Sequence, residues 1–267
     1  MASQAMDAAD ESWTIDDPLT DAQAKAQALS LHADQLQLNL QALERDTLEA
    51  MSRQGAAGAI ALAAVPTFAT RWLLPRLPQF AARHPELVVH IETRTRPFLF
   101  ADTGFDAALY SGTPEQVANW AGTHALLLIE EEVVPVCAPA LLGSRKRWQP
   151  AELAALPLLQ QSTRPEAWRQ WFEAMGVDTP FALSGPRHEL YSMSAAAAAC
   201  GLGVALVPRL LIEPELARGE LVVACARPLK SGRAYYLITP ERGEPRPALT
   251  ALARWLQDMT AAPGRMA

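Results

Sequence analysis

Long apolar runs are missing from this sequence, and so is an N-terminal leader. No stretch reaches the roughly 20 residues of a membrane span without charges or prolines. The opening residues, MASQAMDAADESW, have no basic start and no apolar segment, so they do not form a secretory signal. These absences predict a cytoplasmic protein that does not contact membranes.

Cysteine is scarce as well. The three cysteines are Cys137, Cys200 and Cys225, and none belongs to a CxxC pair, so no zinc or redox motif is present. All three have apolar neighbours in the sequence, which predicts small core residues in a reducing compartment.

The common catalytic motifs are also lacking. The chain contains no G-x-S-x-G elbow, P-loop or H-E-x-x-H. The GLG at Gly201–Gly203 follows a predicted helix and precedes a predicted strand, which is the reverse of what a dinucleotide fingerprint requires. The histidines show no ligand spacing; they are His32, His84, His90, His124 and His188. We therefore expect neither an enzyme nor a cofactor or metal.

An excess of basic residues is absent too. Lys and Arg number 23 against 29 Asp and Glu, which gives a formal net charge of -6. Residues 1–54 hold ten acidic and three basic residues, a balance of -7, so the remainder carries +1. Because contacts to DNA phosphates need Lys and Arg, the segment 1–54 does not supply a recognition helix.

The composition changes near residue 20. Residues 1–20 are polar, acidic and aperiodic, which predicts a disordered or remnant segment. Residues 21–54 lack Gly and Pro, and their apolar positions alternate steps of four and three. This heptad seam predicts a linker helix that dimerises. The alternative is an ordinary helix lying on the domain body. The leucines of the seam are Leu29, Leu36, Leu40 and Leu43.

Beyond residue 58 the pattern alternates between strands and helices. Apolar segments predict strands at 59–65, 87–93, 105–110, 126–137, 158–160, 203–207, 221–224 and 234–239. Helices are predicted at 69–83, 166–175, 192–200 and 249–259, and a turn at 230–232. Such alternation predicts an α/β fold with parallel-rich sheets and helices on both faces.

Several motifs carry a resemblance to a known family. In order, they are VPTFATRWLLPRLPQFAARHPELVVHIETRTR from Val65, FDAALYSG from Phe105, VVPVCAPALL from Val133, ELYSMSAAAAACGLGVALVPRLLIEPELARGELV from Glu189 and YYLITP from Tyr235. Over residues 58–260 the chain resembles LysR-type regulator effector domains, in the subgroup of the glycine-cleavage activator and the β-lactamase regulator.

The resemblance implies two Rossmann-like subdomains joined by a double crossover, as in type 2 periplasmic binding proteins. The first would hold 58–130 plus 241–262, and the second 131–240. The phrase PLTDAQ, from Pro18, resembles the end of the family's winged DNA-binding domain. Only twenty residues are present where that domain would lie, so a helix-turn-helix is expected to be missing. The gene start was assigned too late, the domain was lost, or the protein was trimmed. DNA would then be reached through a missing or partner-supplied helix-turn-helix.

The same resemblance places a ligand between the subdomains, where strands end and helices begin. The candidate effector-binding residues are Thr67, Thr70, Arg71, Arg96, Ser162, Thr163, Ser192, Met193 and Tyr236. Competing interpretations are plain N-caps for Ser and Thr, surface charges for the arginines and a half-buried sheet residue for the tyrosine.

These observations predict a regulator that senses a small metabolite and acts as a homodimer or higher oligomer. Helix N-termini carry free N–H groups, so the effector is expected to be anionic or amino-acid-like. A stand-alone cytoplasmic solute-binding protein of the same fold is the alternative, and such a protein would be monomeric.

Overall fold

The computed structural model describes residues 58–241 and 246–261. The predicted segments 1–20 and 21–54, including the seam leucines Leu29, Leu36, Leu40 and Leu43, lie outside the described residues. No helix within the described part of the chain is long and apolar enough to cross a membrane.

Nine described strands form one sheet in the order β2-β1-β3-β9-β4-β7-β5-β6, with β8 paired to β4. Their bounds are β1 (Ala59–Ala64), β2 (Val88–Thr93), β3 (Ala107–Gly112), β4 (Thr123–Cys137), β5 (Leu158–Gln161), β6 (Arg187–His188), β7 (Val204–Pro208), β8 (Val222–Val223) and β9 (Leu229–Pro240). β1 pairs in parallel with β2 and β3, and β5 pairs in parallel with β6 and β7. The long strands β4 and β9 are antiparallel to each other and connect these two parallel groups.

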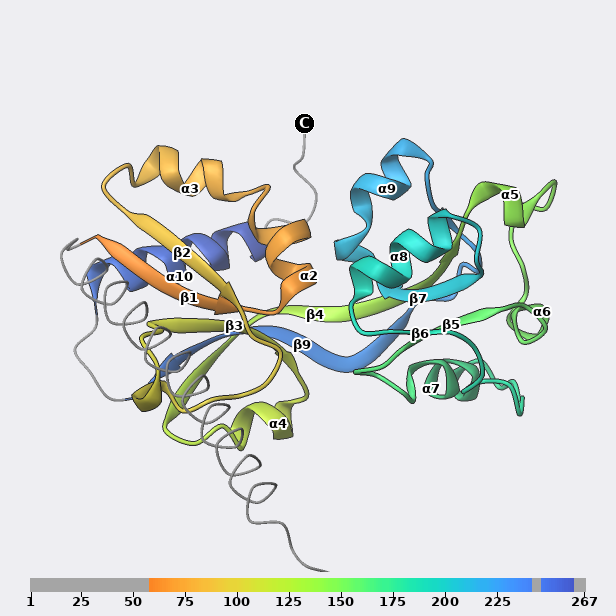
Figure 1. The fold of residues 1–267 in the computed structure, drawn as a ribbon, viewed down its shortest axis with the longest axis horizontal. Coiled ribbons are helices and arrows are strands. Elements are labelled where there is room, and N and C mark those ends of the chain that lie inside the picture. The colour runs from red at the N-terminus through yellow and green to blue at the C-terminus, as the bar shows by residue number, and fades with distance from the viewer. Residues whose placement is uncertain (1–57, 242–245, 262–267) are drawn as a thin grey trace, which may run out of the picture. The chain divides into compact units, whose positions relative to one another are not determined.

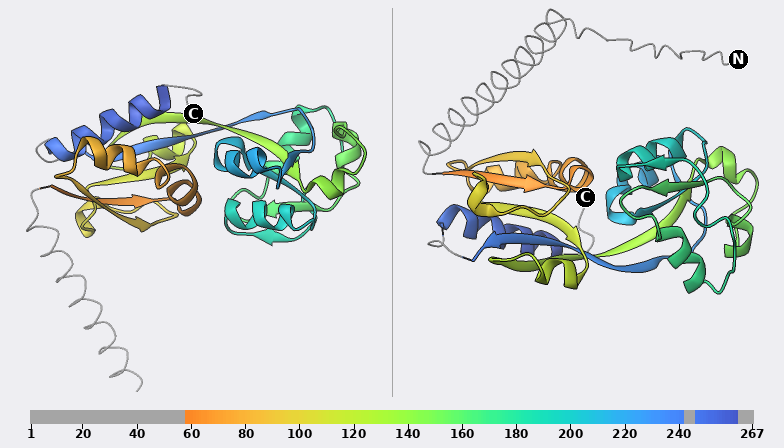
Figure 2. Two further views of the ribbon diagram at one scale, coloured as in Figure 1. Left: turned by 90° about the horizontal axis from the view of Figure 1, so that it is seen from above. Right: turned by 60° about the horizontal axis from the view of Figure 1, so that its bottom comes forward.

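Helices cover both parallel groups (Figures 1 and 2). They are α2 (Pro66–Phe68), the π-helical turn η1 (Ala69–Leu73), α3 (Leu77–Arg83), the 3-10 turn η2 (Phe100–Asp102), α4 (Pro114–Ala118), α5 (Pro139–Leu142), α6 (Pro150–Leu153), α7 (Ala167–Ala174), α8 (Tyr191–Ala199), the 3-10 turn η3 (Arg209–Leu211), α9 (Glu213–Arg218) and α10 (Pro247–Ala261). We call β1–β3 with α2–α4 and α10 lobe I, and β5–β8 with α5–α9 lobe II. The predicted α/β class with a double crossover is confirmed by this arrangement.

Each lobe has its own apolar core on both faces of its strands. In lobe I, alternate residues of β1 point to opposite faces, so Leu62 packs with Phe68 and Trp255 while Ala63 packs with Trp120. In lobe II, α7 buries Trp168, Trp171 and Phe172 against one face of the strands, and alanines of α8 cover the other face. Alanine suits that position because a small side chain lets a helix lie close to a sheet.

Two local predictions are wrong. The single helix expected at 69–83 is divided into η1 and α3, because Pro75 has no N–H to donate to a helical hydrogen bond. The turn expected at 230–232 is part of β9: its register against β4 shifts there, and Gly232 takes a positive φ of 72°. A glycine in a bulge therefore bends the strand without ending it.

The cysteine prediction holds for two positions only. Cys137 and Cys225 are buried, whereas Cys200 is exposed at the end of α8. Cys200 lies at the C-cap of α8, beyond the turns whose alanines pack against the sheet.

Candidate functional site

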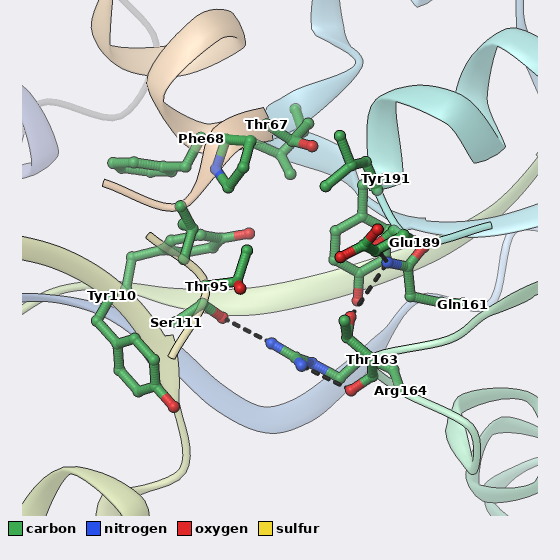
Figure 3. A pocket seen from close by; sticks show the side chains of 15 residues that line it. Thr67, Phe68, Thr95, Tyr110, Ser111, Gln161, Thr163, Arg164, Glu189 and Tyr191 are labelled. Atoms are coloured by element: carbon green, nitrogen blue, oxygen red, sulfur yellow. Dashed lines mark hydrogen bonds between the residues drawn. The ribbon is translucent and has the colours of Figure 1, made fainter. Parts of the chain in front are cut away.

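A cavity lies between the two lobes, and we call it the first cavity (Figure 3). Its volume is about 80 Å³. The lining residues come from both lobes and from β9; they are Val65, Pro66, Thr67, Phe68, Thr95, Tyr110, Ser111, Gln161, Thr163, Arg164, Glu189, Leu190, Tyr191, Leu211 and Tyr235. A concave site with apolar walls and a few polar groups is the usual form of a small-molecule site.

The topology explains why these segments meet. β1 and β3 of lobe I are parallel, and so are β5 and β7 of lobe II, so within each lobe their carboxyl ends share one edge. The segments that follow β1 and β5, beginning at Val65 and Ser162, therefore face the same crevice. The first turn of α8, at Tyr191, enters it from lobe II.

Direct contacts join the lobes beside the first cavity. The backbone N–H of Ser192 donates to Thr67 Oγ1 at 3.3 Å, and the Thr67 hydroxyl lies 3.5 Å from Ser192 Oγ. Leu211 of lobe II packs into the core cluster that contains Phe68. An ion pair between Arg71 and Glu215 adds a third connection. The structure therefore shows the lobes in contact across the cavity.

The lobe II wall is polar and well bonded. Gln161 is buried; its amide nitrogen donates to Thr163 Oγ1 at 3.1 Å and to the carbonyl of Glu189, and its amide oxygen accepts from Ser194 Oγ at 3.3 Å. Next to it, Arg164 reaches from lobe II toward lobe I, where its Nη2 lies 3.5 Å from Ser111 Oγ (Figure 3). These contacts hold a guanidinium in place at the edge of the cavity.

A buried carboxylate lies close to this wall. Glu131 of β4 is 1% exposed, and it accepts a hydrogen bond from Ser231 Oγ at 2.9 Å. Burial, followed by the negative charge of Glu131, raises the pKa of the Tyr235 and Tyr191 hydroxyls. Both tyrosines therefore stay protonated at neutral pH and can donate hydrogen bonds.

Metal binding finds no support in the described residues. No group of three His, Cys, Asp or Glu side chains lies close enough together there to hold an ion. The first cavity is lined by hydroxyls, an amide, the Arg164 guanidinium, the Glu189 carboxylate and aromatic rings.

Comparison with known proteins identifies the fold and the family. A family model described as the LysR substrate binding domain matches residues 53–261. The chain belongs to the LysR family. The predicted resemblance is thus confirmed.

Relatives and solved structures agree with the LysR assignment. The chain is 34% identical over 195 residues to the "HTH-type transcriptional activator AmpR" of Rhodobacter capsulatus, covering 73% of this chain and 64% of that protein. It is 29% identical to the "Glycine cleavage system transcriptional activator" of Escherichia coli K12, covering 79% and 68%. The effector domain of AmpR from Pseudomonas aeruginosa superposes with a TM-score of 0.66 at 31% identity, covering 76% of this chain and 96% of that domain.

These curated relatives are regulators of transcription, not enzymes. The match covers slightly less than two thirds of the Rhodobacter AmpR sequence. What is shared with this LysR relative is therefore the effector-binding part of the protein.

Some of the residues predicted to bind the effector meet at the first cavity of this LysR domain. Thr67 and Thr163 line it from opposite lobes, and Ser192 contacts Thr67 beside it. Their role in binding stays a prediction, but their convergence is what the sensor hypothesis requires.

The other predicted residues lie elsewhere. Thr70 bonds to carbonyls of its own helix, and Arg71 pairs with Glu215. Arg96 and Ser162 are exposed and do not line the first cavity. Met193 is 48% exposed on the outer side of α8. A helix start brings only some of its side chains to the crevice, because successive helical positions point about 100° apart.

Tyr236 lies on the other face of β9 from the cavity. It packs with Tyr110 and Trp120 in lobe I, whereas its neighbour Tyr235 lines the cavity and stacks on Phe68 with 4.4 Å between ring centroids. Successive strand residues point to opposite faces, so a shift of one residue decides which tyrosine reaches the cavity.

The sequence reasoning missed Arg164, Gln161 and Glu131. One signal was available for Gln161, since a glutamine that ends a buried strand needs polar partners. Glu131 falls at the predicted boundary between the subdomains, and no sequence pattern assigned it to the site. Strand alternation within the triplet Glu130–Glu132 sends Glu131 inward and leaves Glu132 exposed.

Proposed function

We propose that this chain is the ligand-sensing part of a LysR-family regulator and that its effector binds in the first cavity. The observation that carries the proposal is a small cavity whose walls come from both lobes of a LysR effector domain. A ligand held there contacts lobe I and lobe II at once. Binding therefore changes the relative stability of open and closed lobes, which is the basis of a population shift.

The effector is a small anionic or amino-acid-like molecule. Arg164 offers a guanidinium at the cavity, and a guanidinium binds a carboxylate through paired hydrogen bonds. Glu189 lines the same cavity and can accept from an ammonium group. Phe68 and Tyr235 supply an aromatic floor for the apolar part of such a ligand.

Regulation requires dimers and access to DNA. The heptad segment 21–54 would join two copies, and the DNA contacts would come from a helix-turn-helix that is not among the described residues or is supplied by a partner chain. In this mechanism, closing the lobes alters how paired effector domains hold their DNA-binding heads. A dimer is expected in light scattering after size exclusion, and a monomer would favour the solute-binding alternative.

A binding screen with one matched pair of variants tests the site. Amino acids and small carboxylates are screened by thermal shift, since a ligand that binds only the folded state raises the melting temperature. A hit is then titrated by calorimetry against Thr67→Val and Thr70→Val. Thr67 lines the cavity, whereas Thr70 bonds only within its own helix.

The expected result is affinity about fivefold weaker in Thr67→Val and unchanged in Thr70→Val, because one lost hydrogen bond is worth about 1 kcal/mol. Equal affinities in all three proteins would show that the ligand binds outside the first cavity. That result would remove the main support for the proposed site.

A further inference from the structure

A second cavity adjoins the first. Its volume is about 210 Å³, more than twice that of the first cavity. It shares Thr163, Arg164 and Tyr191 with the first cavity, so these side chains form the partition between the two. Its remaining lining residues are Thr113, Glu131, Val133, Pro165, Glu166, Ala167, Gln170, Leu229, Ser231 and Arg233.

Two arginines face this second cavity, from different parts of the chain. Arg164 extends across the crevice toward Ser111 of lobe I (Figure 3). Arg233 lies on β9, where its Nη2 donates to the Ser111 carbonyl at 3.1 Å and to Gln116 Oε1 at 2.9 Å. Ser111 is therefore the common neighbour that brings the two guanidinium groups together.

Neither guanidinium forms an ion pair with a carboxylate of the residues that the structure describes. Both Nε atoms are buried without a hydrogen-bond partner among the described residues. The groups that accept hydrogen bonds from the two guanidinium groups are carbonyls, one amide oxygen and one hydroxyl. Burial lowers the pKa of Arg233, and the positive charge of Arg164 lowers it further, so the two cations lie in a partly desolvated place where they repel each other.

One buried carboxylate partly compensates the positive charges of Arg164 and Arg233. Glu131 accepts from Ser231, and its charge acts on Arg233 from a distance. Glu166 also lines the cavity, but it is 43% exposed and pairs with Arg169. Around the buried part of the cavity, two positive charges thus face one negative charge, and a surplus of one remains.

We infer that the second cavity is an anion subsite that takes a carboxylate between Arg164 and Arg233. A single negative charge cancels the surplus, and a planar carboxylate fits the donor geometry of guanidinium groups. Val133 and Leu229 provide an apolar wall for a short carbon chain attached to it.

This inference rests on the proposed function and narrows its ligand class. An effector whose body lies in the first cavity would extend past Arg164 and place a carboxylate in the second. The ligand class is therefore an elongated acid, longer than the first cavity alone can hold.

The subsite is tested on the full chain with butyrate as the probe and butyramide as its neutral analogue of similar shape. Binding is followed by thermal shift and by ligand-observed NMR at constant ionic strength. The variants are Arg233→Gln, the exposed-surface control Arg83→Gln, and Thr67→Val in the first cavity.

Butyrate is expected to raise the melting temperature saturably in the unaltered chain and in Arg83→Gln, while butyramide does not. Arg233→Gln should weaken butyrate binding by about fivefold or more, since a charge-assisted hydrogen bond is lost. Arg233→Lys, which keeps the charge, should retain part of the binding. Thr67→Val should leave butyrate binding unchanged.

Equal responses to butyrate and butyramide would overturn the inference, and this comparison needs no variant to fold. Butyrate binding that survives Arg233→Gln but is lost in Thr67→Val would also overturn it, because the acid would then occupy the first cavity. The proposed function would stand in that case. The proposed function fails separately if Thr67→Val does not weaken the binding of any effector found in the screen.

Discussion

The ion pair between Arg71 and Glu215 connects η1 of lobe I to α9 of lobe II, beside the first cavity. The side chains are only 23% and 12% exposed, and Arg71 Nη1 also lies 3.4 Å from the Leu211 carbonyl. Arg71 was predicted to bind the effector. In the structure a carboxylate of the protein takes that place, so we predict that Arg71 holds the lobes together.

The energy of this pair follows from its burial. Removing one partner of a fully buried pair costs about 3–5 kcal/mol, whereas exposed pairs contribute about 0.2–1 kcal/mol. With about a fifth of each side chain exposed or less, the Arg71–Glu215 pair falls between these limits. We expect a coupling energy of about 1–2 kcal/mol, since water still reaches part of the pair.

The assay is a double-mutant cycle of Arg71→Ala, Glu215→Ala and the double variant, read from urea unfolding. The matched control is the cycle for Lys230 and Glu130, another long-range pair with side chains 74% and 62% exposed. Its coupling should be too small to measure. A coupling for Arg71–Glu215 no larger than the control would refute the reasoning.

The same variants separate the two roles of Arg71. If it only holds the lobes together, Arg71→Ala and Glu215→Ala weaken effector binding by similar factors. A direct contact to the effector would make Arg71→Ala clearly the more damaging of the two.

Three further predictions concern the labelling of Cys200, the ionisation of Cys137 and the core of lobe II. At pH 8 a thiol reagent such as DTNB should label Cys200 rapidly and leave Cys137 and Cys225 unlabelled, because only Cys200 is exposed. The variant Cys200→Ser should remove the fast phase of labelling. A second rapidly labelled thiol would contradict the burial of Cys137 and Cys225. Burial raises the pKa of the Cys137 thiol from its ordinary value of 9.0 to about 11, so the unfolded chain ionises first and the free energy of unfolding should fall as the pH rises through that window. Trp168 is 1% exposed and its Nε1 donates to the Leu159 carbonyl at 3.0 Å, so Trp168→Ala should destabilise the protein by about 3–5 kcal/mol in urea unfolding, and a loss below about 1 kcal/mol would place the side chain outside the core.

The sequence by itself determined the order and type of the main elements. Buried strands such as β1 and β7 are short apolar runs between turn residues, and this signal is local. The motif that begins at Val65 also indicated the family, because its residues are consecutive and can be recognised without knowledge of the fold. Local chemistry likewise placed polar residues at the helix starts that border the crevice.

Only the tertiary structure decided which side chains form the site. Thr67 and Ser192 are 125 positions apart, and Arg164 and Ser111 are 53 apart, so their contacts depend on how β4 and β9 join the lobes. The choice of Tyr235 over Tyr236 depends on the register of β9 against β3 and β4, which pairing across the sheet fixes. The partner of Arg71 could not be predicted from the sequence either, because a charged side chain pairs with whichever opposite charge the fold brings nearest.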